Sequence, residues 1–321
     1  MASPLLALEE LSVGFRVGGE VLKALDGISL TIPSNRIVGV VGESGSGKST
    51  VALALMGLLP SNATSVVGRM AFDGKRYDLA NRVELERLRG DRIAMVFQDP
   101  MTALNPVFTI GTQLVDAQRR KQPGLRVAEL RERARVILGR VGMTDTAERL
   151  GQFPHELSGG MRQRVMIAMA LLAEPRLLIA DEATTALDVT IEAQIMTELE
   201  TLRGAIEGSI LLVSHSLGLV SQICDEVVVL YAGRVVESAT THDLFTGARH
   251  PYTKALISCE RPSEPETRRF RSIPGSVPRL VDRPKGCIFA ARCPSAMDRC
   301  RSEVPPWRGT ESGHGAACWL A

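Results

Sequence analysis

Short apolar runs separated by glycine and proline fill the first 40 residues and predict the strands of a mixed sheet. These runs cover residues 11–17, 21–25 and 28–32, and they alternate apolar with polar side chains. A fourth run at residues 37–41 is wholly apolar and predicts a buried strand. It leads into a glycine-rich segment and then into a helical pattern over residues 49–59, an order typical of α/β proteins.

After residue 98 the pattern becomes helical. One stripe recurs at spacings of three and four and predicts an amphipathic helix: Leu130, Ala134, Ile137 and Val141. Residues 165–172 predict a further helix, and three apolar runs predict buried strands at 177–180, 210–213 and 227–231. Because strands alternate with helices, we expect an α/β fold with a mostly parallel sheet and a helical subdomain at about residues 99–165.

The residue composition changes again near residue 246, so we predict one domain over residues 5–245 and an extension over residues 246–321. Nine of the 17 prolines lie in the extension, which leaves little room for long elements. Four of the six cysteines lie in the last 35 residues. A segment this short buries little core, so it needs either a staple or the main domain to hold it.

Composition and charge indicate an ordinary globular chain, with 45% hydrophobic residues, 23% charged residues and a net charge of +2. The extension from residue 246 carries 13 Lys and Arg against 7 Asp and Glu. Its arginines are scattered among prolines and cysteines, so we expect no nucleic-acid partner. The longest apolar run, residues 165–173, is too short to span a bilayer, and the acidic N-terminal segment lacks the features of a secretory signal. We therefore expect a protein of the cytoplasm.

Residues 42–50 match a phosphate-binding loop that would hold ATP. Successive backbone N–H groups cradle phosphate oxygens in such a loop, while Lys48 reaches the β- and γ-phosphates and the Ser49 hydroxyl ligates Mg²⁺. The strand before the loop and the helix after it strengthen the match. The predicted ATP-binding residues of the loop are Gly42, Ser44, Gly45, Ser46, Gly47, Lys48, Ser49 and Thr50.

Two further residues are candidates on chemical grounds. Asp181 ends a buried apolar strand, where an unpaired carboxylate is costly, so Mg²⁺ is its expected companion; a helix N-cap is the alternative. Phe15 is the one aromatic residue before the loop and is the candidate to stack on adenine, although a role in the core is nearly as plausible.

The cysteines of the extension could hold a metal centre. Cys287, Cys293, Cys300 and Cys318 are separated by five, six and seventeen residues. Stable disulfides are not expected in the cytoplasm, and the close pairs typical of structural zinc are missing. Zinc, an iron–sulfur cluster and inert thiols all remain open, with His314 as a substitute ligand.

The segment Leu157-Ser158-Gly159-Gly160-Met161, followed by Arg162-Gln163-Arg164, resembles the signature of ATP-binding cassette (ABC) ATPases. The resemblance extends over about residues 5–245 and implies a RecA-like core, an antiparallel β subdomain and an α-helical subdomain. Helix N-termini attract anions. In the family, the helix that starts at Ser158, Gly159 and Gly160 faces the ATP of the opposite subunit.

The same resemblance assigns roles to four more positions. It implies that Glu182 is the general base for the attacking water and that His215 contacts the γ-phosphate. Gln98 would sense Mg²⁺ and water, so Mg²⁺ would lie near Ser49, Gln98 and Asp181. Asp188 would lie at the seam between two cassettes.

Three stretches resemble the oligopeptide and dipeptide permease branch of the family: residues 97–106, 184–190 and 250–253. The cysteine pattern resembles that of the branch's C-terminal extension, which implies a 4Fe-4S cluster on Cys287, Cys293, Cys300 and Cys318. Ala183 stands where Pro is usual and Ser216 where Asp is usual, which puts the hydrolysis rate in doubt.

The sequence therefore predicts an ATP-hydrolysing importer subunit on the cytoplasmic face of the membrane, for dipeptides or oligopeptides. The implied partners are two transmembrane permeases, a second homologous cassette subunit in a heterodimer, and an extracytoplasmic solute-binding protein. One alternative is a non-transport ABC ATPase of repair, translation or cluster assembly. Another is an importer of the same branch for nickel or a different solute.

Overall fold

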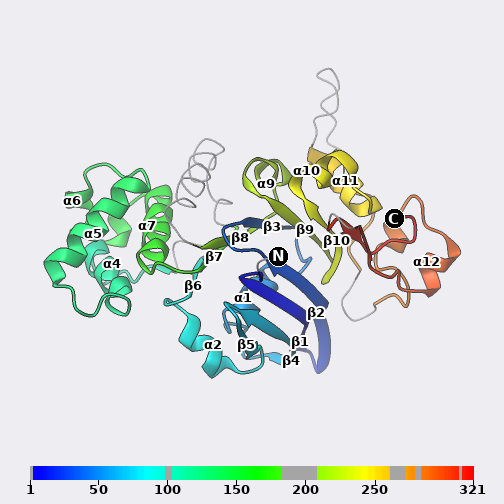
Figure 1. Ribbon diagram of the computed structural model, residues 1–321, viewed down its shortest axis with the longest axis horizontal. Coiled ribbons are helices and arrows are strands. Elements are labelled where there is room, and N and C mark those ends of the chain that lie inside the picture. Colours follow the sequence, from blue (N-terminus) through cyan, green and yellow to red (C-terminus); the bar gives the residue numbers. More distant parts are fainter. Residues whose placement is uncertain (1–2, 98–102, 183–207, 261–271, 279–282, 311–312) are drawn as a thin grey trace, which may run out of the picture. The chain divides into compact units, whose positions relative to one another are not determined.

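The computed structural model describes residues 3–97, 103–182, 208–260, 272–278, 283–310 and 313–321. The chain divides into two compact units. Unit 1 comprises residues 1–84 and 212–321, and unit 2 comprises residues 85–211. Both units contain strands and helices, as the sequence predicts (Figure 1).

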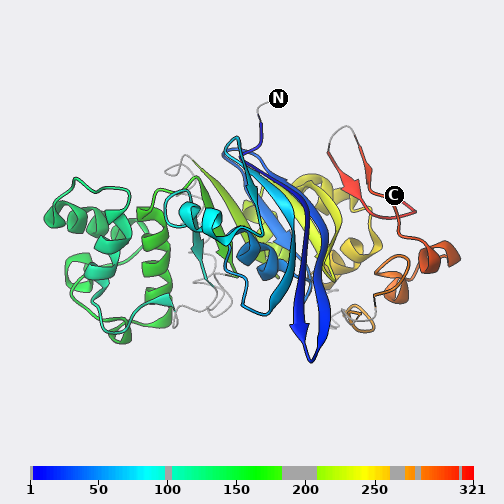
Figure 2. The same ribbon diagram turned by 90° about the horizontal axis from the view of Figure 1, so that it is seen from below.

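An antiparallel sheet forms the N-terminal part of unit 1, in the strand order β2-β1-β4-β5. Its strands are β1 (Leu6–Val17), β2 (Glu20–Ile32), β4 (Ala63–Phe72) and β5 (Lys75–Asp78). Figure 2 shows the long β1 and β2 running side by side. The predicted break between residues 25 and 28 is wrong. The strand continues through a register shift near Gly27, whose N–H donates to Ser12 Oγ at 3.0 Å.

The second sheet region of unit 1 is built on β3 (Ile37–Val41), whose five residues are all buried. β3 runs parallel to β9 (Glu226–Tyr231), and β9 pairs antiparallel with β10 (Arg234–Thr240). The extension adds β12 (Gly315–Ala316) to β10 and β11 (Arg308–Gly309) to β12. The end of the chain is thus joined to the sheet by backbone hydrogen bonds.

Helices complete unit 1. They are α1 (Lys48–Leu55), α9 (Leu217–Ile223), α10 (Thr241–Gly247), α11 (Pro251–Glu260), α12 (Asp298–Ser302) and the 3-10 turn η2 (Ala290–Arg292). α1 ends four residues before the predicted helix does. The proline-rich extension accommodates the ten-residue α11 because its one proline occupies the first helical position, where no N–H bond is lost. Two elements span the boundary between the units: α2 (Arg82–Leu88) and β8 (Ser209–Ser214).

Unit 2 combines a parallel strand pair with a group of helices. β6 (Ile93–Val96) pairs with β7 (Leu177–Asp181). The helices are α4 (Ile110–Arg119), α5 (Val127–Arg140), α6 (Thr146–Arg149), α7 (Gly159–Leu172) and the 3-10 turn η1 (Pro154–Glu156). α4, α5 and α7 pack on one another (Figure 1).

The predicted apolar stripe of α5 is confirmed with one change. Leu130, Ala134 and Val141 are buried, but Leu138 is fully buried where Ile137 is only partly so. The polar Gln118 is also buried, and its amide donates to the Leu114 and Leu130 carbonyls at 3.0 Å each. A buried amide is tolerated here because its donors are satisfied.

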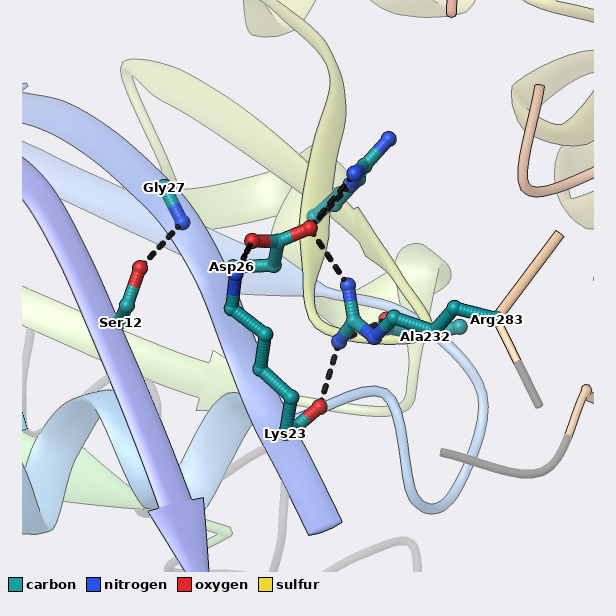
Figure 3. A network of polar contacts seen from close by, with 7 residues as sticks. Ser12, Lys23, Asp26, Gly27, Ala232 and Arg283 are labelled. Carbon is teal, nitrogen blue, oxygen red and sulfur yellow. Dashed lines mark hydrogen bonds and ion pairs between the residues drawn. The ribbon is translucent and has the colours of Figure 1, made fainter. Parts of the chain in front are cut away.

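Asp26 joins the extension to the antiparallel sheet (Figure 3). Its Oδ2 accepts from Arg234 Nη2 at 2.6 Å and from Arg283 Nη1 at 2.8 Å, and Lys23 forms a further ion pair. Arg283 Nη2 also donates to the Lys23 carbonyl at 2.6 Å. Burial alone would raise the pKa of Asp26, but the bonds from Lys23 and Arg234 and the charges of Arg234 and Arg283 together lower it.

We expect Asp26→Ala to destabilise unit 1 by about 2 kcal/mol, because it leaves two poorly exposed arginines without their carboxylate. The melting temperature of the nucleotide-free protein measures this effect. Asp116→Ala is the control, since Asp116 is well exposed and forms an ion pair with Arg119 of the same helix. Equal melting temperatures for the two variants would contradict the prediction.

Candidate nucleotide-binding site

The glycine-rich loop lies between β3 and α1, as the sequence predicts. The loop is closed by backbone bonds, with Ser46 N–H donating to the Glu43 carbonyl at 3.1 Å and Gly233 N–H donating to the Ser46 carbonyl at 2.8 Å. α1 begins at Lys48, with Gly47 as its N-cap at φ 103°. The first N–H groups of a helix have no acceptor within the helix itself, so a bound phosphate would accept hydrogen bonds from them.

Gly42 is required by a close backbone approach. Its φ is 153°, and a Cβ added there would lie 2.2 Å from the Leu230 carbonyl oxygen of β9. No side chain fits in that space without moving the strand. Glycine at this position therefore allows the loop backbone to pack directly against the β9 backbone.

Lys48 and Ser46 turn their side chains inward. Lys48 is 4% exposed, and its Nζ donates to the Gly42 carbonyl at 2.9 Å and to the Glu43 carbonyl at 3.3 Å. Ser46 is 1% exposed, and its hydroxyl has no hydrogen-bond partner among the described residues. Buried hydroxyls are normally bonded, so this one is a candidate contact for a ligand.

Glu43 is a loop residue that the sequence analysis missed. Its backbone N–H donates to the Tyr252 hydroxyl at 2.9 Å, and its carboxylate accepts two bonds from Arg292 at 2.6 and 3.0 Å. Both partners belong to the extension. Neither has a local sequence signal, because they lie 209 and 249 residues from Glu43.

His215 and Ser216 follow β8. His215 is exposed, and Ser216 is the N-cap of α9, where its Oγ accepts from Leu219 N–H at 3.2 Å. Serine and aspartate are comparable N-caps. The replacement of the usual Asp by Ser216 therefore keeps the start of α9 intact.

Unit 2 contains the signature segment and the two neighbouring carboxylates Asp181 and Glu182. Ser158 is the N-cap of α7 and accepts from Met161 N–H at 3.3 Å, and both Ser158 and Gly159 are exposed. Asp181 ends β7 and is 6% exposed. Glu182 follows with φ 45°, a conformation that is costly for a non-glycine residue and occurs at functional sites.

The remaining predicted site residues fall into two groups. Phe15 is partly buried on β1, opposite Leu22 of β2 and Ala63 of β4. Gln98, Ala183 and Asp188 lie outside the described residues. The phosphate loop and His215 belong to unit 1, whereas Ser158, Asp181 and Glu182 belong to unit 2.

The four cysteines of the extension line one small cavity of about 20 Å³. They are free thiols, and burial raises the pKa of Cys287 and Cys293, with a further increase from the neighbouring thiols. In the described part of the chain, no group of three or more His, Cys, Asp or Glu side chains is placed to hold a single metal ion. The alternative ligand His314 is instead 2.7 Å from Glu237 Oε1.

These features define a P-loop nucleotide-binding protein with an added cysteine-containing segment. Residues 25–185 match the ABC transporter family, and residues 236–300 match the family described as the oligopeptide/dipeptide transporter C-terminal region. The chain belongs to the ABC transporter ATP-binding family, which confirms the prediction from the signature.

Curated relatives and solved structures agree with this family. The dipeptide transport ATP-binding protein DppD of Escherichia coli is 44% identical over 98% of this chain and 96% of its own. The oligopeptide transport ATP-binding protein OppD of Haemophilus influenzae is 43% identical over 99% of this chain and 98% of its own.

The fold matches the dimeric post-hydrolysis structure of the ATP-binding cassette MJ0796 bound to ADP and Pi. The TM-score is 0.66 and the identity 28%, over 74% of this chain and 98% of that one. The structure of cbiO1 from Clostridium perfringens, part of the ABC transporter complex cbiONQ, matches with a TM-score of 0.63 at 29% identity, over 77% and 92%.

Gly42→Ala should weaken ATP binding, because the added methyl group collides with the β9 backbone. The affinity for ATP, measured by calorimetry, is expected to fall by more than about 10-fold. Gly139→Ala is the matched control: Gly139 is exposed on α5, and a Cβ there meets nothing within 4 Å among the described residues. Unchanged ATP affinity in Gly42→Ala would show that the loop tolerates displacement.

Proposed function

We propose that this chain is the ATP-hydrolysing subunit of an ABC importer for dipeptides or oligopeptides. One observation carries the proposal: the same chain combines an ABC cassette with the peptide-transporter C-terminal region and matches DppD and OppD almost end to end. That combination favours the importer over ABC ATPases of repair, translation or cluster assembly. The choice between a peptide and another solute of the same branch follows from the relatives' substrates.

The loop supplies the electrostatic part of the ATP chemistry. Lys48 would neutralise phosphate charge, and Ser49, Asp181 and Gln98 would hold Mg²⁺, which would balance further phosphate charge. Glu182 accepts the proton of the attacking water, and His215 contacts the γ-phosphate. The buried position of Asp181 and the strained backbone of Glu182 support these roles. Phe15 is proposed to stack on the adenine.

The signature serves the ATP of a second cassette. A Cβ on Gly159 would meet nothing within 4 Å among the described residues, so the fold of this chain does not itself require a glycine there. A glycine there leaves the exposed N-terminus of the 14-residue α7 open to the close approach of a ligand. The dimeric state of MJ0796 is consistent with two cassettes, and Asp188 is proposed to lie at their seam.

The subunit acts from the cytoplasmic face of the membrane. No helix in the described part of the chain is long and apolar enough to cross a bilayer. We propose that two permease subunits provide the pathway, that a second homologous cassette completes the ATP sites, and that an extracytoplasmic protein delivers the solute. We propose residues 5–245 as the ATPase domain, with a helical subdomain at about 99–165, and residues 246–321 as the extension.

Glu182→Gln should keep ATP binding but lower hydrolysis by about 100-fold or more, because the general base is lost while the phosphate contacts remain. The assay is ATP turnover and peptide uptake by proteoliposomes that contain the assembled complex. Glu148→Gln, an exposed position on α6, is the control and should leave both rates unchanged. Hydrolysis by Glu182→Gln within about threefold of the native rate would show that Glu182 is not the general base. ATP hydrolysis by the native complex without any peptide uptake would contradict the proposal of a peptide importer.

The extension is proposed to hold a 4Fe-4S cluster on Cys287, Cys293, Cys300 and Cys318. Two observations support the fit: the four thiols line one cavity, and all four are free. A cluster of four irons and four sulfides needs thiols spread around its periphery, unlike a single ion, which needs them to converge. When bound, it would turn the cysteines into thiolate ligands and staple this part of the chain.

Anaerobically purified protein is expected to contain about four iron and four sulfide per chain. Cys300→Ser should lose both, whereas Cys259→Ser, in α11 and away from the cavity, should retain both. Elemental analysis and acid-labile sulfide assays provide the measurement. One zinc per chain and no sulfide would reject the cluster.

A further inference from the structure

Arg292 of the extension is bound directly to the phosphate loop. Its two terminal nitrogens donate to the two carboxylate oxygens of Glu43, at 2.6 and 3.0 Å, in a bidentate pair. The Arg292 side chain is 5% exposed and that of Glu43 is 26% exposed. Charged pairs with this planar geometry are among the stronger hydrogen-bonded contacts in proteins.

Arg292 is itself held rigidly. Its Nε donates to the Pro274 carbonyl at 2.8 Å, and Nη2 donates to the Ile273 carbonyl at 3.0 Å. Nη1 also donates to the Tyr231 hydroxyl of β9 at 3.2 Å. All five guanidinium N–H groups therefore have an acceptor. The hydrogen bond to Glu43 raises the pKa of Arg292 above its usual value. Because Arg292 is held in one position, it can also hold the Glu43 carboxylate in one position.

Glu43 is in turn bonded to loop residues that are expected to contact the nucleotide. It directly follows Gly42, its carbonyl accepts from Lys48 Nζ, and it also accepts from Ser46 N–H. Its own N–H is bound to the Tyr252 hydroxyl of α11. The extension thus holds both the backbone and the side chain of Glu43, and the Glu43 carbonyl in turn accepts from Lys48.

The contacts belong to the cysteine-containing segment. Arg292 ends η2 and directly precedes Cys293, and Cys287 precedes η2. Phe289, next to η2, packs on the Tyr252 ring with centroids 5.3 Å apart and on the Tyr231 ring at 5.2 Å. The two side chains that reach Glu43 are therefore placed by the same short segment that lines the cysteine cavity.

We propose that Arg292 and Tyr252 are positioning residues for ATP binding, and that the extension holds the phosphate loop in its binding conformation through Glu43. The inference rests on the proposed function only in that the loop binds ATP. It does not depend on which group the cysteines hold. A preformed loop loses less conformational freedom on binding, so loss of these contacts raises the Kd and the KM for ATP rather than lowering kcat.

The test uses full-length Arg292→Gln, Glu43→Gln and their double variant, with Kd measured for a non-hydrolysable ATP analogue. We expect each single variant to raise the Kd by about fivefold or more. The double variant should bind no more weakly than the weaker single variant, because both changes remove one interaction. Arg301→Gln, an exposed arginine of α12, is the control and should bind as the native protein does. Additive losses in the double variant would overturn the proposal.

Tyr252→Phe separates positioning from folding, because it removes the acceptor for Glu43 N–H while keeping the ring that packs on Phe289. In the assembled complex it should raise the KM for ATP by about threefold or more at unchanged kcat. A lower melting temperature with native KM would show a purely structural role and overturn the proposal. Failure of the native protein to bind the analogue would instead reject the proposed function.

Discussion

The phosphate loop is shaped by the short turn between β9 and β10. Gly233 of that turn comes so close to β2 that a Cβ would lie 2.0 Å from the Ala24 carbonyl oxygen. Its N–H donates to the Ser46 carbonyl at 2.8 Å, and its carbonyl accepts from Asp26 N–H at 2.9 Å. One glycine thus binds the loop to the antiparallel sheet. Because the approach is between backbones, no other residue type can make it without moving one of the two segments.

The same turn connects the extension to the rest of unit 1. Arg283 Nη2 donates to the Ala232 carbonyl at 3.2 Å, beside its contacts with Asp26 and Lys23 (Figure 3). The fully buried Glu237 of β10 accepts from the Arg249 and His250 N–H groups and is paired with His314. These polar contacts add to the small group of buried apolar side chains in the extension, which includes Tyr252, Ile288 and Phe289. The extension is therefore an integral part of unit 1, and it reaches the loop through Glu43.

The residues proposed for ATP chemistry divide between the two units. Unit 1 provides phosphate binding, and unit 2 provides the carboxylates of Asp181 and Glu182 and the signature at Ser158. The contacts of Tyr252 and Arg292 with Glu43 lie within unit 1.

Local patterns were enough to predict the family, the loop and most buried strands. β3 and residues 177–180 of β7 are uninterrupted apolar runs. The loop and the signature are contiguous motifs whose chemistry depends on neighbouring residues. The continuous β2 was missed because Gly27 reads locally as a break, whereas pairing with β1 absorbs it as an irregularity. Contacts between residues about 200 positions apart could not be predicted from periodicity. Glu43, Tyr252, Arg292 and the Asp26 network depend on which segments the fold brings together, and only the tertiary structure decides that.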